Sequence, residues 1–379
     1  MRHILSSFGL LGFLMGGYYA LWQPQILDRG FSVADLGILL AIRTAVSLTV
    51  DLPTGILADK IGQKRTTVIG FLFYFLAFIP PIISMHPLAL AATVIIVGVG
   101  DAFISGAMDS WAAIVQQKSD NTLSTKKFAT RDQIQRFGMI AGALALPACF
   151  SLLNGSTPLS WAIYAFAAAL LLIVSLSAPS DKNGQITSHQ PSSWKEVFKA
   201  PGMVIIVIAS FFFGMGDGGV ELIFWPRIKE LGVNEAALFG VIQMSMSIAR
   251  IVGLEIWKRT HLIEKTSTPA IAILGSSAFF FVFAFVDTPV FAVAIWLIRI
   301  AVLCVFFSSL NSLLVKMHLN NKQSATALSL VGIVGSMGKV VFTGGVGGAG
   351  FFNLYQLNIT AAGLFLVSSF LFGFVKDRS

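Results

Sequence analysis

The chain has 379 residues, of which 55% are hydrophobic and only 12% are charged, and its formal net charge is +8. Soluble domains carry about 25% charged residues, and a soluble core of this size could not bury so much apolar surface. The composition therefore excludes an ordinary soluble protein and predicts an all-α membrane protein that lies in a lipid bilayer.

Twelve apolar runs are each long enough to cross a bilayer, which requires about 20 helical residues. The first run continues through Tyr18, Tyr19 and Trp22 and lacks a small-residue cleavage site, so we do not read it as a signal peptide. The predicted spans are 5–26, 34–58, 67–85, 88–116, 133–153, 158–177, 203–226, 235–257, 268–286, 288–316, 323–349 and 355–375. Cys149 and Cys304 lie inside these runs, which predicts neither a disulfide nor a metal framework.

The basic residues are distributed unequally between the two sides of the predicted membrane. If the amino terminus is cytoplasmic, eighteen Lys and Arg residues fall in inside segments, and three (Arg29, Arg227 and Lys229) fall outside. The positive-inside rule then places both termini in the cytoplasm and the chain in a cell membrane, inner or plasma. This asymmetry also explains the positive charge without a nucleic-acid partner.

Two short patterns recur 202 residues apart along the chain: Gly16-Gly17 as Gly218-Gly219, and Pro24-x-Ile26-x-x-x-Gly30 as Pro226-x-Ile228-x-x-x-Gly232. The repeat predicts two pseudo-symmetric six-helix bundles, 1–177 and 203–379. Residues 178–202 between them are rich in Pro, Ser and Lys and read as a cytoplasmic linker. Two such halves are typical of carriers that bind their substrate near the bilayer midplane.

A short charged turn separates the second and third spans. It reads Asp51-Leu-Pro53-Thr-Gly55-Ile-Leu-Ala-Asp59-Lys60-Ile-Gly62-Gln-Lys64-Arg65. This stretch resembles the loop between helices 2 and 3 of the major facilitator superfamily, whose pattern is roughly G-x-L-A-D-[RK]-x-G-[RK]-[RK]. Gln63 departs from that pattern, where a base is usual.

The resemblance implies a conformational latch in this loop, in which Asp59 caps the start of helix 11 when the cytoplasmic side is closed. The latch residues by this interpretation are Asp51, Gly55, Asp59, Lys60, Gly62, Lys64 and Arg65. The alternative for both acids is local capping and loop shape.

Four ionisable residues fall near the middle of predicted spans: Asp101, Asp217, Arg299 and Lys339. A charge in hydrocarbon is costly, so such residues usually face a cavity or a partner. In the superfamily, helices 1, 4, 7 and 10 line the central cavity. The resemblance therefore implies that Asp101, Asp217 and Arg299 point into a shared aqueous site.

Further polar residues follow these charges at helical spacing. Asp101, Ser105 and Asp109 would form one stripe on helix 4, and Asp217 and Glu221 would share a face of helix 7. Two neighbouring carboxylates repel one another, so one of them can take up a proton, as a proton-coupled carrier requires.

The alternative is that the acids pair with Arg299, Lys339 or Arg250 and only hold helices together. Arg43 on helix 2 is expected to pack or to form a salt bridge. Tyr18, Tyr19, Trp22 and Gln23 on helix 1 are candidates for substrate binding, although aromatic residues near a span end are often interfacial anchors.

Two features differ from common branches of the superfamily. Helix 4 lacks the arginine that often precedes its glycines, and Asp101 stands in that region instead. The helix 5 signature of drug antiporters is poorly matched by Gly138-x-x-x-Gly142 and Pro147. The first difference argues against the usual proton relay of the superfamily, and the second weakens the assignment to the commonest class of drug exporter.

No phosphate-binding loop of the form G-x-x-x-x-G-K-[ST] occurs, so we expect a gradient-driven carrier and not an enzyme. The expected function is proton-coupled export of a small amphiphilic or polar organic molecule by a monomer that needs no cofactor or metal. Uptake by proton symport is the close alternative. A non-transporting receptor or a lipid-moving protein on the same scaffold is the second alternative.

Overall fold

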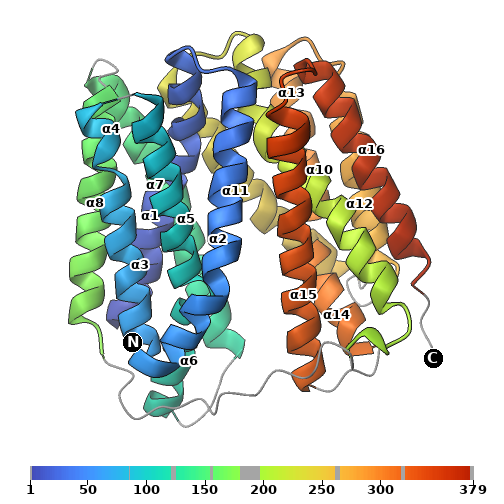
Figure 1. Cartoon of the computed structure of the whole chain (residues 1–379), viewed down its shortest axis with the longest axis horizontal. Helices are drawn as coiled ribbons and strands as arrows, with labels where there is room; N and C mark the ends of the chain where they lie inside the picture. Colours follow the sequence, from blue (N-terminus) through green and yellow to red (C-terminus); the bar gives the residue numbers. More distant parts are fainter. Residues whose placement is uncertain are drawn as a thin grey trace. The chain divides into compact units, whose positions relative to one another are not determined.

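The computed structural model describes residues 2–84, 86–120, 125–153, 157–179, 197–260, 265–316 and 321–375. These residues are almost entirely helical and include no strand, which confirms the all-α prediction (Figure 1). The helices up to residue 177 are α1 (Arg2–Asp28), α2 (Val33–Ile61), α3 (Gln63–Ala77), α4 (Pro80–Ile83), α5 (Pro87–Ile104), α6 (Ala107–Asp120), α7 (Thr125–Leu152) and α8 (Thr157–Ser177). Those that follow are α10 (Met203–Glu230), α11 (Ala236–Arg259), α12 (Thr268–Phe283), α13 (Pro289–Leu303), α14 (Phe306–Lys316), α15 (Asn321–Val340), the π-helical segment η2 (Val341–Gly347) and α16 (Leu354–Gly373).

Eleven helical stretches of the described chain are long and apolar enough to cross a membrane. The predicted ninth span, 268–286, corresponds to the shorter apolar helix α12, which has 16 residues. Backbone hydrogen bonds from Ala284 and Phe285 to the preceding turn lengthen this helix slightly. An apolar helix therefore stands at each of the twelve predicted spans, in agreement with the predicted fold class.

Three predicted spans are interrupted where the sequence suggested continuous helices. The fourth span breaks at Ser105–Gly106, between α5 and α6, and the tenth breaks after α13 at Cys304. Gly106 has a φ of 69°, a conformation that glycine adopts without a Cβ clash. The eleventh span changes from α15 to the π-helical η2 in its glycine-rich last third.

Contacts divide the chain into two compact units. Unit 1 comprises Met1–Arg29, Ile42–Ser188 and Asn234–Ser247, and unit 2 comprises Gly30–Ala41, His189–Val233 and Ile248–Ser379. The start of α2 belongs to unit 2 because Gly37 packs on η2, where a Cβ would lie 2.5 Å from the Thr343 carbonyl oxygen. The start of α11 belongs to unit 1 because Gly240 packs on α7 in the same way. The division into halves 1–177 and 203–379, with a linker at 178–202, stays a prediction.

Glycines bring α1 and α7 into backbone contact inside unit 1. A Cβ at Gly16 would lie 2.1 Å from the Met139 carbonyl oxygen, and one at Gly142 would lie 1.8 Å from that of Phe13. Small residues four apart allow membrane helices to pack this closely. The Gly138-x-x-x-Gly142 pattern, which matched a drug-antiporter signature poorly, therefore forms a packing surface for α1.

Unit 2 contains the equivalent contact between α10 and α15. A Cβ at Gly214 would lie 1.8 Å from the Gly335 carbonyl oxygen, and Gly218 faces the backbone of Lys339. Gly218 is the repeat partner of Gly16 in the sequence. The repeated glycines therefore have the same role in each unit: they seat the first helix of a repeat against another helix of the same unit.

Candidate functional site

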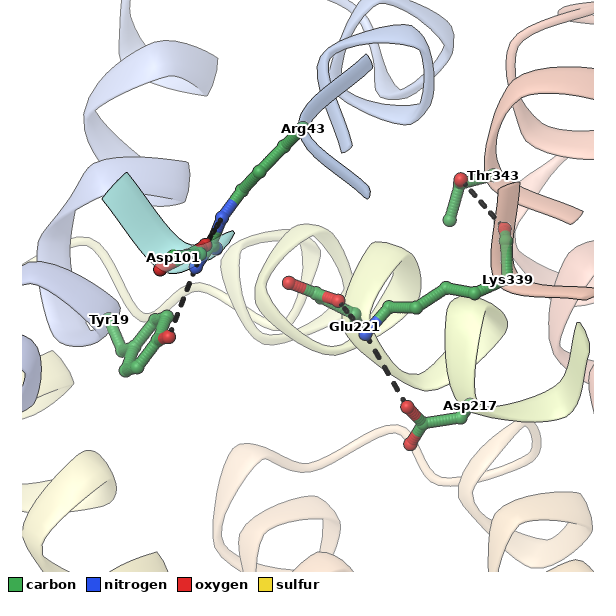
Figure 2. A network of polar contacts seen from close by, with 7 residues as sticks. All are labelled: Tyr19, Arg43, Asp101, Asp217, Glu221, Lys339 and Thr343. Carbon is green, nitrogen blue, oxygen red and sulfur yellow. Dashed lines mark hydrogen bonds and ion pairs between the residues drawn. The ribbon is translucent and has the colours of Figure 1, made fainter. Parts of the chain in front are cut away.

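Asp101 is the centre of a polar cluster in unit 1. Arg43 of α2 donates from Nε and Nη2 to Asp101 Oδ2, at 2.9 and 2.8 Å. The Tyr74 hydroxyl of α3 donates to Oδ1 of the same carboxylate. Tyr19 of α1 accepts a 3.2 Å hydrogen bond from Arg43 Nη2 (Figure 2). Hydrogen bonds that involve a charged group are strong, so α2 and α3 are held to the carboxylate on α5, and α1 joins the cluster through Arg43.

Two glycines beside Asp101 make this cluster possible. A Cβ at Gly98 would lie 2.7 Å from the Arg43 carbonyl oxygen, so α2 can approach α5 only where a side chain is absent. A Cβ at Gly100 would lie 2.9 Å from the Tyr74 ring, which sets the approach of α3. The sequence Gly98-x-Gly100-Asp101 thus places one acid between two closely packed helices.

The polar contacts of unit 1 continue toward the break in the fourth span. Thr54 Oγ1 donates to the Asp51 carbonyl at 2.9 Å and to the Ala102 carbonyl at 3.1 Å. Asp51 and Ser105 are both exposed.

The expected regular stripe of Asp101, Ser105 and Asp109 is interrupted. The helix ends before Ser105 and restarts at Ala107, so Asp109 lies in the first turn of α6 and not on α5. Asp109 pairs with Arg131 of α7 at 3.0 Å. The two segments of the broken span are therefore each anchored by a separate ion pair.

Lys339 of α15 is the centre of a second cluster, in unit 2. Its Nζ lies 3.4 Å from Asp217 Oδ2 and forms an ion pair with Glu221, both on α10 (Figure 2). Thr343 donates to the Lys339 carbonyl at 2.9 Å. The side chains of Lys339, Asp217 and Glu221 are 24%, 40% and 23% exposed. One base thus faces two partly accessible acids.

The two clusters use repeat-related positions. Tyr19 and Glu221 stand 202 residues apart, the spacing of the sequence repeat. Tyr19 contacts Arg43 in unit 1, and Glu221 contacts Lys339 in unit 2. The first helix of each repeat therefore presents a polar group to a base on another helix.

Arg299 of α13 lies apart from the ion pairs of Lys339. It is 2% exposed, and its guanidinium carbon is 5.0 Å from the Trp296 ring, 5.2 Å from Phe280 and 5.4 Å from Phe365. Nε and Nη2 have no hydrogen-bond partner within the described part of the chain. The guanidinium is therefore held by cation–π contacts inside unit 2.

Of the four candidates on helix 1, Tyr19 is the one that joins a charged cluster. Tyr18 and Trp22 stack with ring centroids 5.6 Å apart in an aromatic core shared with α8, and both are fully buried. Gln23 is also buried. The Tyr18 and Trp22 rings thus pack within unit 1, and a role in substrate binding stays a prediction for all three residues.

The turn between α2 and α3 is a single residue, Gly62, with a φ of 97°. That conformation explains the glycine, because a Cβ would strain it. Lys64 donates to the Leu176 carbonyl at 2.9 Å and to that of Ala178, so it caps the end of α8. Five other predicted latch residues have exposed side chains or backbones: Asp51, Gly55, Asp59, Lys60 and Arg65. The latch itself stays a prediction.

Sequence reasoning missed three of the residues described above. Tyr74, Thr54 and Thr343 are of types common in membrane helices, and no local pattern distinguishes them. Arg43 was expected to form a salt bridge or a packing contact, and its pair with Asp101 confirms that expectation. An arginine inside an apolar run was the available signal.

Residues 4–343 match the Major Facilitator Superfamily. The chain belongs to this superfamily. A relative, the uncharacterized MFS-type transporter YxaM of Bacillus subtilis (strain 168), is 25% identical over 288 residues, which cover 72% of this chain and 70% of YxaM.

Solved structures of the nucleoside transporter NupG have the same fold as this facilitator. A structure of a single-substitution mutant of NupG aligns with a TM-score of 0.78 at 17% identity over 98% of this chain and 99% of NupG. The structure of NupG itself aligns with a TM-score of 0.76 at 16% identity over 99% and 98% of the two chains. The protein is thus a multi-pass membrane transporter of the facilitator type, which implies a small-molecule substrate.

Proposed function

We propose that this facilitator is a proton-coupled carrier of a small polar organic solute, which works by alternating access as a monomer. The observation that carries the proposal is the pairing of Lys339 with both Asp217 and Glu221. This cluster has two acids and one base, so one acid can take up a proton while the lysine keeps a charged partner. The cluster then changes its net charge by one unit without leaving a buried ion unpaired, which would be costly.

The charges of both clusters favour a solute without strong net charge. Asp101 is neutralised by Arg43, and Lys339 neutralises one of its two acids. A neutral or zwitterionic solute can exchange hydrogen bonds with such pairs without adding an unpaired charge. NupG is a nucleoside transporter by name, so nucleosides are the first solutes to test.

Uptake by proton symport is the direction we propose. An acid-rich amphipathic cavity favours export of amphiphiles by proton antiport, but Arg43 and Lys339 neutralise two of the three acids in the clusters. Export by antiport is the second candidate, because Asp217 is 40% exposed and gives the Lys339 cluster one acid in excess. A receptor or a lipid-moving protein would show neither activity.

The proposal keeps the predicted membrane topology and latch. By the distribution of basic residues, both termini and the linker lie in the cytoplasm, and the protein resides in the inner or plasma membrane of the cell. The exposed Asp59, Lys60 and Arg65 then lie at the cytoplasmic end, where they can latch the halves. The protein acts as a carrier and not as an enzyme, and it requires no cofactor or metal.

Transport by purified protein in liposomes tests the proposal. Vesicles receive labelled uridine, adenosine, cytidine and a zwitterionic amino acid, with the pH gradient imposed in either direction, and an internal pH dye follows protons. We expect solute to accumulate when protons flow inward, with a matching acidification of the vesicle interior. Glu221→Gln should abolish accumulation driven by the gradient, while Glu230→Gln, an exposed acid paired with Arg227, should not.

Two results would reject the proposal. Solute movement that ignores the pH gradient would remove the coupling to protons. Accumulation that requires protons to flow outward would replace symport by export through antiport.

A further inference from the structure

The guanidinium of Arg299 has one edge that the described residues leave unsatisfied. Nε and Nη2 share this edge, and both are buried without a hydrogen-bond partner in the described part of the chain. In unit 1, Arg43 uses the same edge, Nε and Nη2, to hold the carboxylate of Asp101. Two parallel N–H donors match a carboxylate in both geometry and charge. The edge of Arg299 is therefore shaped for a carboxylate that the described part of unit 2 does not supply.

Such an edge is costly to keep inside a protein, because a buried donor without a partner has lost its hydration and gained no hydrogen bond. The rings of Phe280, Trp296 and Phe365 offset part of the charge of Arg299 through cation–π contacts. These contacts leave the two donors of the edge unsatisfied. An ionisable group at membrane depth that does not stabilise the fold usually marks the path of a substrate or an ion.

The Phe365 ring of α16 contacts both Arg299 and the helix that carries the acids of unit 2. The guanidinium carbon of Arg299 is 5.4 Å from the centre of this ring. A Cβ at Gly216 of α10 would lie 2.8 Å from the same ring, so the backbone of α10 also packs against it. Gly216 directly precedes Asp217. The guanidinium and the segment of α10 that carries Asp217 therefore share one aromatic neighbour.

Asp217 is the acid of the Lys339 cluster that is most open to a solute. Its side chain is 40% exposed and its Oδ2 lies 3.4 Å from Lys339 Nζ, whereas Glu221 is 23% exposed and makes the closer ion pair. An ammonium group of a solute can thus pair with Asp217 while Lys339 keeps Glu221. Unit 2 then offers one carboxylate and one pair of guanidinium donors, which is the complement of a zwitterion.

We infer that the solute is a zwitterionic amino acid, whose carboxylate binds the Nε–Nη2 edge of Arg299 and whose ammonium group pairs with Asp217. This inference rests on the proposed transport function and narrows its substrate class. Arg299 is only 2% exposed in this structure, so the aromatic rings must move for a solute to bind. Arg299 lies four residues before α13 ends at Leu303, and a turn at a helix end can move without bending a whole helix.

Uptake into vesicles identifies the solute. Vesicles that contain the wild-type protein receive a labelled mixture of the protein amino acids with β-alanine and 4-aminobutyrate. A second set receives labelled uridine, which has no carboxylate. We expect at least one amino acid of the mixture to accumulate when protons flow inward.

Competition by two analogues of the accumulated amino acid tests the assigned contacts. The carboxamide analogue lacks the carboxylate, and the deaminated acid lacks the ammonium group. We expect the wild-type protein to prefer the amino acid to each analogue by about ten-fold or more. Arg299→Met should reduce the preference over the carboxamide to about two-fold or less, and Asp217→Asn should do the same for the preference over the deaminated acid. A residue that only supports the fold would change the affinity for all three compounds equally.

Two further variants complete the comparison. Arg259→Met removes an exposed arginine of α11 that pairs with Glu255, and it should leave both preferences unchanged. Arg299→Lys keeps the charge and loses the paired donors, so its affinity for the amino acid should stay about five-fold or more below that of the wild type. This variant also replaces Arg299→Met should the latter fail to fold.

The outcomes separate this inference from the proposed function. Vesicles that couple neither the amino acids nor any nucleoside to protons refute both. Vesicles that couple a nucleoside and no amino acid refute the inference alone. A preference over the carboxamide that survives Arg299→Met also refutes it. Thermal stabilisation of the purified protein by chloride or phosphate, lost in Arg299→Met and not produced by the amino acids, would assign the edge to an inorganic anion instead.

Discussion

Breaking the pair between Arg43 and Asp101 should measurably destabilise unit 1. Their side chains are 11% and 24% exposed, and Arg43 makes two hydrogen bonds to the carboxylate. Removing one partner of a fully buried pair costs about 3–5 kcal/mol. Because Asp101 keeps some exposure and the Tyr74 hydrogen bond, we expect Arg43→Met to lower the free energy of unfolding by about 3 kcal/mol.

A double-mutant cycle isolates the interaction from the other effects of each substitution. Asp101→Asn should cost about 2 kcal/mol, because the guanidinium keeps Tyr19 as an acceptor. The double variant should cost about 2 kcal/mol less than the sum of the single variants, since neither charge is then left alone. Reversible unfolding in mixed micelles, followed by tryptophan fluorescence, gives these differences.

An exposed pair in the same unit serves as the control. Arg136 and Asp132 lie four residues apart on α7 at 2.9 Å, with side chains 21% and 52% exposed. Such a pair should show a coupling energy of about 0.3–0.5 kcal/mol. If the cycle on Arg43 and Asp101 gives a value as small as this, the argument that the inner cluster holds α2 to α5 is wrong.

Three further predictions concern unit 2. Gly214→Ala should lower the free energy of unfolding by about 2–3 kcal/mol, because its Cβ would lie 1.8 Å from a carbonyl oxygen. A Cβ at Gly363 would meet nothing within 4 Å, so Gly363→Ala should raise the free energy of unfolding by about 0.5–1 kcal/mol. Equal values for the two variants in the same micelle assay would refute the packing argument. Lys339→Met should lower protein yield and abolish transport in vesicles, because it leaves two acids face to face. Adding Glu221→Gln should restore the yield and the folding of the protein. A double variant that is not rescued would count against the cluster. Arg299→Met should change the free energy of unfolding by less than about 1 kcal/mol, because the lost cation–π contacts are offset by the removal of a buried charge that no described carboxylate pairs with. A loss above about 3 kcal/mol would refute that balance.

Hydropathy predicted the helices well and their interruptions poorly. A bilayer imposes a minimum length on each apolar run, so the spans could be counted directly. The break at Ser105–Gly106 lies inside the uninterrupted run 88–116, and a single glycine in such a run is usually tolerated within a helix. Its conformation depends on contacts such as that of Thr54 with Ala102, which join residues 48 apart.

The candidate site was predicted residue by residue but not partner by partner. Asp101, Asp217 and Lys339 were recognisable because ionisable groups in apolar runs need a reason to be there. The partners depend on how helices pack, which local spacing does not encode. Arg299 illustrates this: it was expected beside the acids, and in unit 2 it lies among three aromatic rings.

The backbone contact of α10 with α15 limits how this protein can change in length. Glycine faces a carbonyl oxygen there, so the interface depends on which residue points inward. One residue inserted before Gly214 would turn the rest of α10 by about 100° and present a side chain to α15. Insertions and deletions should therefore be excluded from these helices over evolution, even where substitutions to other apolar residues are accepted on their remaining faces.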